Sequence, residues 1–135
     1  MKATRRTAVW LVGAAITVTA AAGCNKSPTG PSEYFTDGFT DTLRPGGGAY
    51  YTYTIVQPGD VEARVISLDP DASMVGVGLG TAAAPGACAL TLQDDSMQVG
   101  DVLKTYLGTG RGCIQVYDPG TAGAPVSYVV EVYHP

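Results

Sequence analysis

The sequence of 135 residues is poor in charged side chains, and this scarcity excludes several classes of protein. Only 15% of the residues are charged, against about 25% in ordinary globular domains. A charge-rich disordered chain is therefore excluded, and so is a coiled coil, whose heptads are rich in Ala, Glu, Lys, Leu and Arg. Glycine, by contrast, is abundant, with 18 residues. The length fits one domain and argues against a two-domain enzyme.

Side chains that catalyse reactions are also scarce. The single histidine is His134, one residue from the C-terminus. A triad base must be oriented by a third group, and we expect His134 to face solvent instead. No Gly-x-Ser-x-Gly motif occurs, and only three Glu are present. The adjacent Asp94 and Asp95 would point to opposite faces of a strand rather than across a cleft. The sequence therefore predicts a protein that is not an enzyme.

The N-terminus has the form of an export signal. A basic segment with Lys2, Arg5 and Arg6 precedes an apolar run of about 15 residues, 8–22. This run is shorter than the roughly 18–20 residues that a membrane-spanning helix needs. Residues 1–23 are therefore predicted to be a signal peptide. The paired arginines leave the export route open between the general secretory and the twin-arginine pathways.

The end of this segment, Ala21-Ala22-Gly23-Cys24, resembles the lipobox of bacterial lipoproteins. The resemblance implies that Cys24 is lipidated and becomes the mature N-terminus. It also implies three attached acyl chains, since one chain alone binds membranes only marginally. The alternative is ordinary signal cleavage nearby, with Cys24 as a spare thiol. Asn25 follows the cysteine where an Asp would favour the inner membrane, so we expect the outer membrane of the bacterial cell envelope, in a cell that has one.

Residues 24–33 are polar and rich in proline, which is typical of an extended tether. A lipid-anchored domain needs such a spacer from the membrane. Without residues 1–23, five basic and twelve acidic residues remain, which gives a net charge of −7. Affinity for phosphates comes from Lys and Arg, so this composition argues against nucleic acid as a partner. We expect a monomer.

Cys88 and Cys113 remain as an even pair in an exported chain, which predicts one disulfide. Two free thiols are the alternative. A metal site would need more ligands, because no Cys-x-x-Cys motif accompanies the single histidine. We assign no cofactor, and calcium is the weaker alternative, since acidic residues at strand ends supply oxygen ligands but match no loop signature. These calcium candidates are Asp69, Asp71, Asp94, Asp95 and Asp118.

From residue 34 onward the chain consists of short runs in which apolar and polar residues alternate. Alternation with period two, as in Tyr51, Tyr53 and Ile55, is typical of strands with one buried face. Turn residues such as Pro58-Gly59 separate the runs. The pattern predicts an all-β domain over 34–135, an antiparallel jelly-roll-like β-sandwich of about eight strands. The runs span residues 34–43, 49–56, 60–68, 74–80, 88–94, 99–107, 112–118 and 126–134.

Four of these runs resemble a known family. The segments Gly48-Ala49-Tyr50-Tyr51-Thr52-Tyr53-Thr54-Ile55, Pro58-Gly59 and Val61-x-Ala63-x-Val65 resemble the bacterial pre-peptidase C-terminal (PPC) domain, and the segments 112–117 and 128–132 resemble its last two strands. The resemblance spans residues 35–134. It implies a non-catalytic jelly-roll-like sandwich of the kind usually appended to secreted hydrolases.

This chain departs from that family in carrying no catalytic domain. We therefore expect a stand-alone, lipid-anchored module with a binding or structural role at the cell envelope. Its partners would be the membrane, through the lipid, and an envelope protein or a glycan. The alternative function is a carbohydrate-binding or calcium-dependent adhesion module.

One run carries glycine at every second position. Gly76, Gly78 and Gly80 share one face of this strand, while apolar side chains fill the other. Glycine leaves bare backbone, so a neighbour must lie close against it or a ligand must bind there. We expect an aromatic ring from an adjacent strand to cover the glycines, and a shallow binding groove is the alternative. The candidate binding face consists of Gly76, Gly78, Gly80, Tyr50, Tyr117 and Tyr133.

Overall fold

The computed structural model describes residues 33–135, so the predicted signal peptide, the lipidation site Cys24 and nearly all of the tether lie outside the described residues. Eight strands and no helix make up the regular structure of residues 33–135, and accordingly no helix in that range is long and apolar enough to cross a membrane. The strands are β1 (Phe35–Leu43), β2 (Gly48–Ile55), β3 (Gly59–Asp69), β4 (Val75–Ala84), β5 (Ala87–Met97), β6 (Val102–Leu107), β7 (Gly110–Tyr117) and β8 (Val126–His134).

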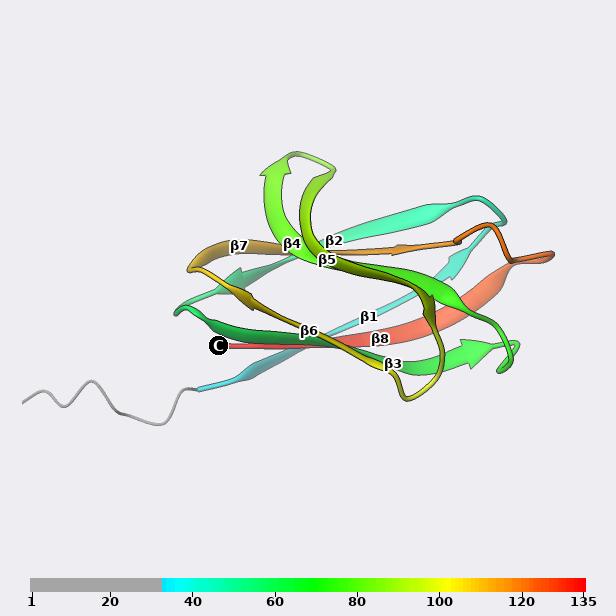
Figure 1. Ribbon diagram of the computed structural model, residues 1–135, viewed down its shortest axis with the longest axis horizontal. Helices are drawn as coiled ribbons and strands as arrows, with labels where there is room; N and C mark the ends of the chain where they lie inside the picture. The colour runs from blue at the N-terminus through cyan, green and yellow to red at the C-terminus, as the bar shows by residue number, and fades with distance from the viewer. Residues whose placement is uncertain (1–32) are drawn as a thin grey trace, which may run out of the picture. The chain divides into compact units, whose positions relative to one another are not determined.

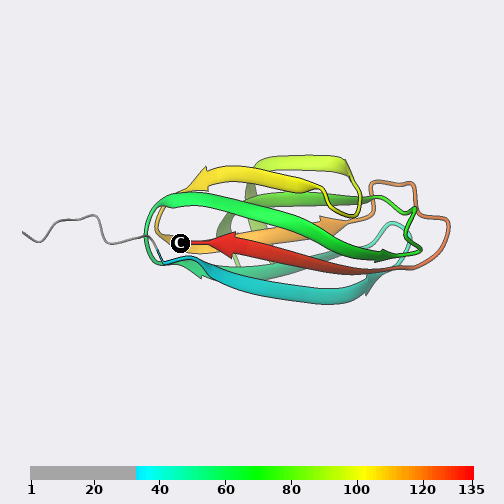
Figure 2. The same ribbon diagram turned by 90° about the horizontal axis from the view of Figure 1, so that it is seen from below.

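The strands form two four-stranded antiparallel sheets that pack face to face (Figures 1 and 2). One sheet has the order β1-β8-β3-β6 and the other has the order β2-β7-β4-β5. The first strand thus pairs with the last, the second with the seventh, the third with the sixth and the fourth with the fifth. This arrangement confirms the predicted all-β, antiparallel sandwich of eight strands.

The strand positions agree with the predicted runs except at two places. β4 and β5 are longer than predicted and form one long hairpin, which includes residues that the sequence left outside the strands. β6 begins at Val102 rather than at residue 99, because the preceding residues form a turn. The backbone N–H of Asp101 donates to the carbonyl of Gln98 at 3.1 Å, and Gly100 has a φ of 93°, which favours glycine.

The core lies between the two sheets and is built from every second residue of the strands. In β8, for example, Val130 and Val132 are fully buried, while Val129 and Glu131, which alternate with them, are partly exposed. Removing these side chains from water supplies the main stabilising force, at about 25 cal/mol per Å² of apolar surface. The fully buried side chains include Ile55, Val61, Val65, Val75, Val77, Leu79, Met97, Ile114, Val116, Tyr128, Val130 and Val132.

Polar and aromatic side chains line the seam where the edge strands β1 and β2 face each other. The rings of Phe39 and Tyr51 stack across this seam with their centroids 4.5 Å apart. The hydroxyl of Tyr51 is hydrogen-bonded to the hydroxyl of Tyr128 at 2.7 Å and donates to the carboxylate of Asp41 at 3.4 Å. Burial, reinforced by the bond to Tyr51, raises the pKa of Tyr128, which therefore remains a neutral hydroxyl.

His134 is buried, with an exposed fraction of 3%, so the expectation that it faces solvent is wrong. The period-two burial of β8 continues to its last residue, and the imidazole therefore points into the sandwich. Its Nε2 lies 3.0 Å from a carboxylate oxygen of Asp37, and its ring centroid lies 4.9 Å from that of Tyr53. The N–H of Val56 donates to the carbonyl of Pro135 at 3.0 Å and fixes the C-terminus against β2.

Replacing Tyr53 with phenylalanine tests the packing at this end of the core. The Tyr53 hydroxyl is buried and has no hydrogen-bond partner within residues 33–135. Because leaving a buried polar group unpaired costs about 1–3 kcal/mol, Tyr53→Phe should leave the free energy of unfolding unchanged or raise it. Tyr128→Phe, which breaks the bond to Tyr51, should lower it by about 1 kcal/mol. Urea denaturation measures both, and equal losses in the two variants would contradict this account of Tyr53.

Candidate functional site

The β4–β5 hairpin curls outward from its sheet (Figure 1). The pairing of the two strands shifts register at three places along its length, and such bulges bend a strand and increase its twist. Gly80 lies at one of these shifts, where a Cβ atom would overlap the carbonyl oxygen of Ala89. The tip closes with Gly86, whose φ is 74°. The residues around this tip are small, and most of them are exposed.

A disulfide ties this hairpin to the rest of the sheet, which confirms the predicted bond. It joins Cys88 on β5 to Cys113 on β7, with the two Cα atoms 5.8 Å apart. β4 lies between these strands, and strands two positions apart in a flat sheet are separated by about 9.6 Å. The short distance therefore reflects the curl of β5 over β4. Closing a loop of about 26 residues stabilises the fold by about 3.5 kcal/mol in the loop-entropy model.

The glycine strip on β4 is covered. The ring of Tyr117, on the neighbouring β7, occupies the space where a Cβ of Gly76 would lie. A Cβ at Gly78 would lie 2.7 Å from a methyl carbon of Leu90, and the backbone of β5 covers Gly80. All three glycines are buried. An aromatic ring therefore covers one glycine, an aliphatic side chain the second and backbone the third.

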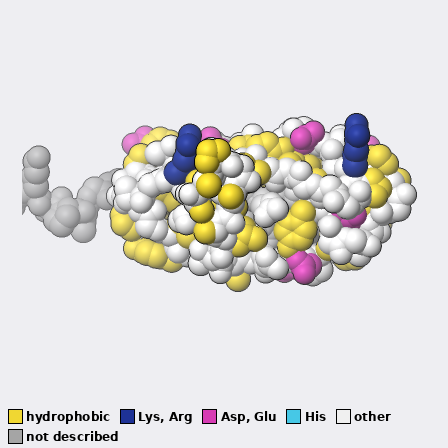
Figure 3. Space-filling view, turned by 90° about the horizontal axis from the view of Figure 1, so that it is seen from above, with side chains coloured by type: hydrophobic (Ala, Val, Ile, Leu, Met, Phe, Trp, Pro, Cys, Tyr) yellow, Lys and Arg dark blue, Asp and Glu magenta, His cyan; other side chains and the backbone are white. Residues whose placement is uncertain are grey.

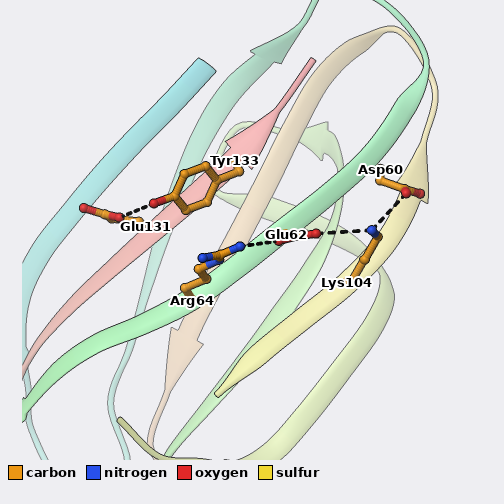
Figure 4. A network of polar contacts seen from close by, with 6 residues as sticks. All are labelled: Asp60, Glu62, Arg64, Lys104, Glu131 and Tyr133. Atoms are coloured by element: carbon orange, nitrogen blue, oxygen red, sulfur yellow. Dashed lines mark hydrogen bonds and ion pairs between the residues drawn. The ribbon is translucent and has the colours of Figure 1, made fainter. Parts of the chain in front are cut away.

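The tyrosines of the candidate binding face lie on two opposite sides of the sandwich. Tyr50 and Tyr117 belong to the sheet that contains the glycines, whereas Tyr133 belongs to the other sheet. There its hydroxyl donates to Glu131 at 2.8 Å, and the guanidinium carbon of Arg64 lies 4.7 Å from its ring centroid (Figure 4). Tyr133 is therefore not part of one surface with the others.

The outer face around Tyr133 carries a network of paired charges (Figure 4). The ammonium of Lys104 lies 3.0 Å from Asp60 and 3.2 Å from Glu62, and Arg64 lies 2.9 Å from Glu62. Hydrogen bonds from Arg64 and Lys104 lower the pKa of Glu62. Such exposed pairs on neighbouring strands stabilise a sheet modestly. Because its charges are paired with each other, we interpret this face as structural.

The outer face of the other sheet is hollowed on two sides of the hairpin. One hollow, of about 370 Å³, lies between the hairpin tip and the side chains of Tyr50, Thr52 and Arg111. The second, of about 420 Å³, lies between β5 and β7. Figure 3 looks onto the side from which the hairpin rises, where hydrophobic and uncharged polar atoms surround a few isolated charged side chains. We call this surface the hairpin face; it comprises Tyr50, Thr52, residues 82–86, Leu90, Gln93, Asp95, Arg111, Gln115 and Tyr117.

The second hollow combines an aromatic ring with hydrogen-bonding groups. Tyr117 donates a short hydrogen bond to the carboxylate of Asp95, and the amides of Gln93 and Gln115 line the same space. Burial, together with the bond to Asp95, raises the pKa of Tyr117 to about 12, so its hydroxyl stays protonated at neutral pH. Because these groups both donate and accept hydrogen bonds, the hollow is suited to binding a polar ligand or a polar part of a partner.

Asp118, one of the calcium candidates, holds the loop between β7 and β8. One of its carboxylate oxygens accepts hydrogen bonds from the backbone N–H groups of Gly120, Thr121 and Ala122, at 3.0 to 3.1 Å. The other accepts from Gly46 at 2.7 Å. These backbone bonds lower the pKa of Asp118.

The other calcium candidates form two pairs of sequence neighbours rather than one cluster. Asp94 accepts bonds from the N–H and hydroxyl of Ser96, Asp95 is bonded to Tyr117, and Asp69 and Asp71 flank Pro70. Within residues 33–135, no three acidic, histidine or cysteine side chains converge as metal ligands.

Sequence reasoning missed the hairpin tip and the two glutamines. Residues 81–87 read as a loop because their alanines carry no alternating pattern, although the Pro85-Gly86 pair marks the turn of a hairpin. Gln93 and Gln115 give no signal of their own, because polar residues at alternate positions are typical of any half-exposed strand. Only the register of β4, β5 and β7 brings them together.

The comparisons with known proteins point to a fold and to no family. No family model matches the sequence, and no curated protein matches it. Among solved structures, the chain is similar to Aeromonas hydrophila PliG, a periplasmic lysozyme inhibitor of g-type lysozyme. The two share 16% sequence identity with a TM-score of 0.54, and the match covers 72% of this chain and 83% of that chain. At this identity the likeness concerns the fold.

Alanine substitutions along the glycine strip test what covers it. Gly80→Ala places a methyl group against the backbone of Ala89, which cannot move without displacing the hairpin, so we expect a loss of about 1–3 kcal/mol in the free energy of unfolding. Gly78→Ala meets only the flexible end of Leu90 and should cost less. Gly38→Ala is the control, because no atom lies within 4 Å of its added Cβ. Equal stability of all three variants in urea denaturation would contradict the close approach at Gly80.

Proposed function

We propose that the protein is an exported, lipid-anchored, non-catalytic module of the bacterial cell envelope, and that it binds a protein partner through its hairpin face. The observation that carries the proposal is the hairpin itself. It projects from the sheet, and the Cys88–Cys113 bond ties β5 to β7 close to the turn of the hairpin. A binding element that is already ordered loses little conformational entropy on association.

The side chains of the hairpin face suit a protein interface. Tyr and Arg are enriched at such interfaces, and Tyr50 and Arg111 line the hollow beneath the tip. The tip, residues 82–86, carries no charge and mostly small apolar side chains. It can therefore insert into a recess of a partner without the cost of burying an unpaired charge.

The polar groups of the described residues support a binding role over catalysis. His134 is buried against Asp37 on the far sheet. In the hollow between β5 and β7, the neutral Tyr117 donates a hydrogen bond to Asp95. His134 has no hydroxyl or thiol among its hydrogen-bond partners within residues 33–135, and the raised pKa of Tyr117 disfavours the tyrosinate that would act as a nucleophile.

The choice of a protein partner is supported by the structural comparison. PliG, whose fold is similar, is an inhibitor of g-type lysozyme, so a sandwich of this shape is suited to binding another protein. PliG is also periplasmic, which agrees with the signal peptide and the lipobox-like segment predicted for this chain. A g-type lysozyme is accordingly the first defined partner to test.

A second candidate function is glycan binding. The hollow between β5 and β7 offers two amides, a carboxylate and an aromatic ring, which match the hydroxyl groups and apolar faces of a saccharide. The hairpin tip would have no role in this function, so variants of the tip separate the two candidates.

Site-specific photo-crosslinking tests the protein-binding function. A benzoylphenylalanine at position 83, in the exposed tip, should give a discrete protein adduct in intact cells, and one at position 40 on β1 should give none. Adding Tyr50→Ala should weaken the adduct about tenfold if Tyr50 is a dominant contact, whereas Tyr106→Ala, at a tyrosine that is 65% exposed on the other sheet, should not. Purified g-type lysozyme serves as the defined partner in vitro. Retention on glycan arrays without any adduct at position 83 would favour the second candidate.

Replacing Cys24 tests the lipid anchor. The apolar run is too short to span a bilayer, so the attached lipid would be the sole hold on the membrane, and Cys24→Ser should release the protein into the soluble fraction. Fractionation after washing with salt and mild alkali measures this release. Resistance of Cys88 and Cys113 to alkylation controls for correct folding. A Cys24→Ser protein that stays with the membranes would mean that the lipid-anchor proposal is wrong.

A further inference from the structure

Four connections of the sandwich gather at one end, which we call the loop end. Figure 2 shows these connections at the end of the domain away from the C-terminus. The loop end comprises residues 44–47, 70–74, 98–101 and 118–125, which join β1 to β2, β3 to β4, β5 to β6 and β7 to β8. The described chain enters and leaves the sandwich at the opposite end, where Phe35 of β1 is paired with His134 of β8.

An apolar groove of about 380 Å³ lies at the loop end, between the β3–β4 and β7–β8 connections. Its walls are formed mainly by Pro70, Ala72, Met74, Ala122, Ala124 and Val126. Except for Val126, which forms its floor, these residues are partly or fully exposed. The unbranched side chain of Met74 can adapt to different occupants.

Both walls of the groove are held by hydrogen bonds of their own. The N–H of Ser73 donates to the carbonyl of Pro70 at 2.9 Å and closes the β3–β4 turn. The carboxylate of Asp118 binds the backbone N–H groups of the β7–β8 loop and one N–H of the β1–β2 turn. The groove is therefore shaped before anything binds in it.

Acidic side chains outnumber basic ones around the groove. Asp69 and Asp71 flank Pro70 at its rim, and Asp101 lies in a neighbouring connection of the same end. Every ion pair found within residues 33–135 involves Arg64, Lys104 or His134, so the acids of the loop end are not neutralised by such pairs. Arg44 is the single basic residue in its four connections. An unpaired acidic rim attracts and orients a basic partner.

We propose that this groove is a docking site for a basic protein segment, in which an apolar side chain enters the groove and flanking Lys or Arg side chains meet Asp69 and Asp71. The inference rests on the proposed function and specifies the chemistry of the protein partner. The groove and the hairpin face adjoin, because Asp118 and Pro119, at the start of the β7–β8 loop, also line the hollow between β5 and β7. One partner surface can therefore cover both.

Two labelled peptides test the charge and the apolar anchor together. The basic probe is acetyl-Lys-Lys-Leu-Leu-Lys-Lys-amide, and the acidic probe has Glu in place of each Lys. Fluorescence anisotropy with the full-length chain should show saturable binding of the basic probe, at least about tenfold tighter than that of the acidic one. The affinity should fall at high salt, because salt screens exposed charges. No binding of the basic probe, or equal binding of both probes, would overturn the proposal.

Variants locate the binding on the groove. Asp69→Asn combined with Asp71→Asn should weaken the basic probe about five- to tenfold, since each exposed charge contributes modestly. Ala124→Trp should fill the groove and abolish binding. The controls are Glu33→Gln, an exposed acid at the other end, and Thr40→Trp, an exposed position on β1, and both should bind like the wild type. Unchanged binding by Ala124→Trp would place the probe elsewhere and overturn the proposal.

These experiments distinguish a failure of the groove inference from a failure of the proposed function. If a protein adduct forms at position 83 while the basic probe does not bind, the hairpin function stands and the groove inference is wrong. If the basic probe binds the groove and no adduct forms at position 83, the groove inference stands and the role of the hairpin is wrong. NMR chemical-shift changes confined to residues 69–74 and 118–126 would confirm the location.

Discussion

The close approach of β5 to β4 is the constraint on which the candidate site depends. A strand that is bare on one side lets its neighbour fold over it, and β4 is bare because Gly76, Gly78 and Gly80 alternate along its outer face. β5 can then curl far enough for the Cys88–Cys113 bond to reach across β4 to β7. The glycines weaken the strand itself, and the disulfide offsets this loss by constraining the unfolded chain. The raised hairpin and the hollows on its two sides follow from that geometry.

A second constraint applies where the sandwich has free edges. An exposed edge strand can pair with another molecule and aggregate. β1 places the carboxylates of Asp37 and Asp41 on the side that faces the seam, where they bind His134 and Tyr51. An inward-pointing charge on an edge opposes such pairing, because the incoming strand would have to bury it. The contact with Asp37 thus gives a structural reason for the burial of His134 near the end of the chain.

The sequence predicted which residues alternate but not which surface they reach. Period two separates inner from outer side chains, so the core positions of β8 followed from the pattern. The disulfide followed from the even pair of cysteines. It does not say to which sheet a strand belongs, and for that reason Tyr133 was grouped with Tyr50 and Tyr117 although it lies on the opposite face. His134 was misjudged because chain ends are usually exposed, whereas the alternation of β8 runs through to it. The hairpin and the groove depend on register and loop packing, which a single sequence does not encode locally.

The net charge of the domain does not show which acidic side chains are paired with basic ones and which are not. Two acids on the outer face of the β1-β8-β3-β6 sheet, Asp60 and Glu62, are paired with Arg64 and Lys104, and pairing largely cancels their field beyond a few ångströms. The acids at the loop end form no such ion pairs within residues 33–135, so their negative field is not cancelled there. An even distribution of the same charge would repel acidic partners without orienting basic ones. Because these unpaired acids lie at the end that also carries the apolar groove, a basic partner attracted by charge arrives at a surface that can hold it by apolar contact.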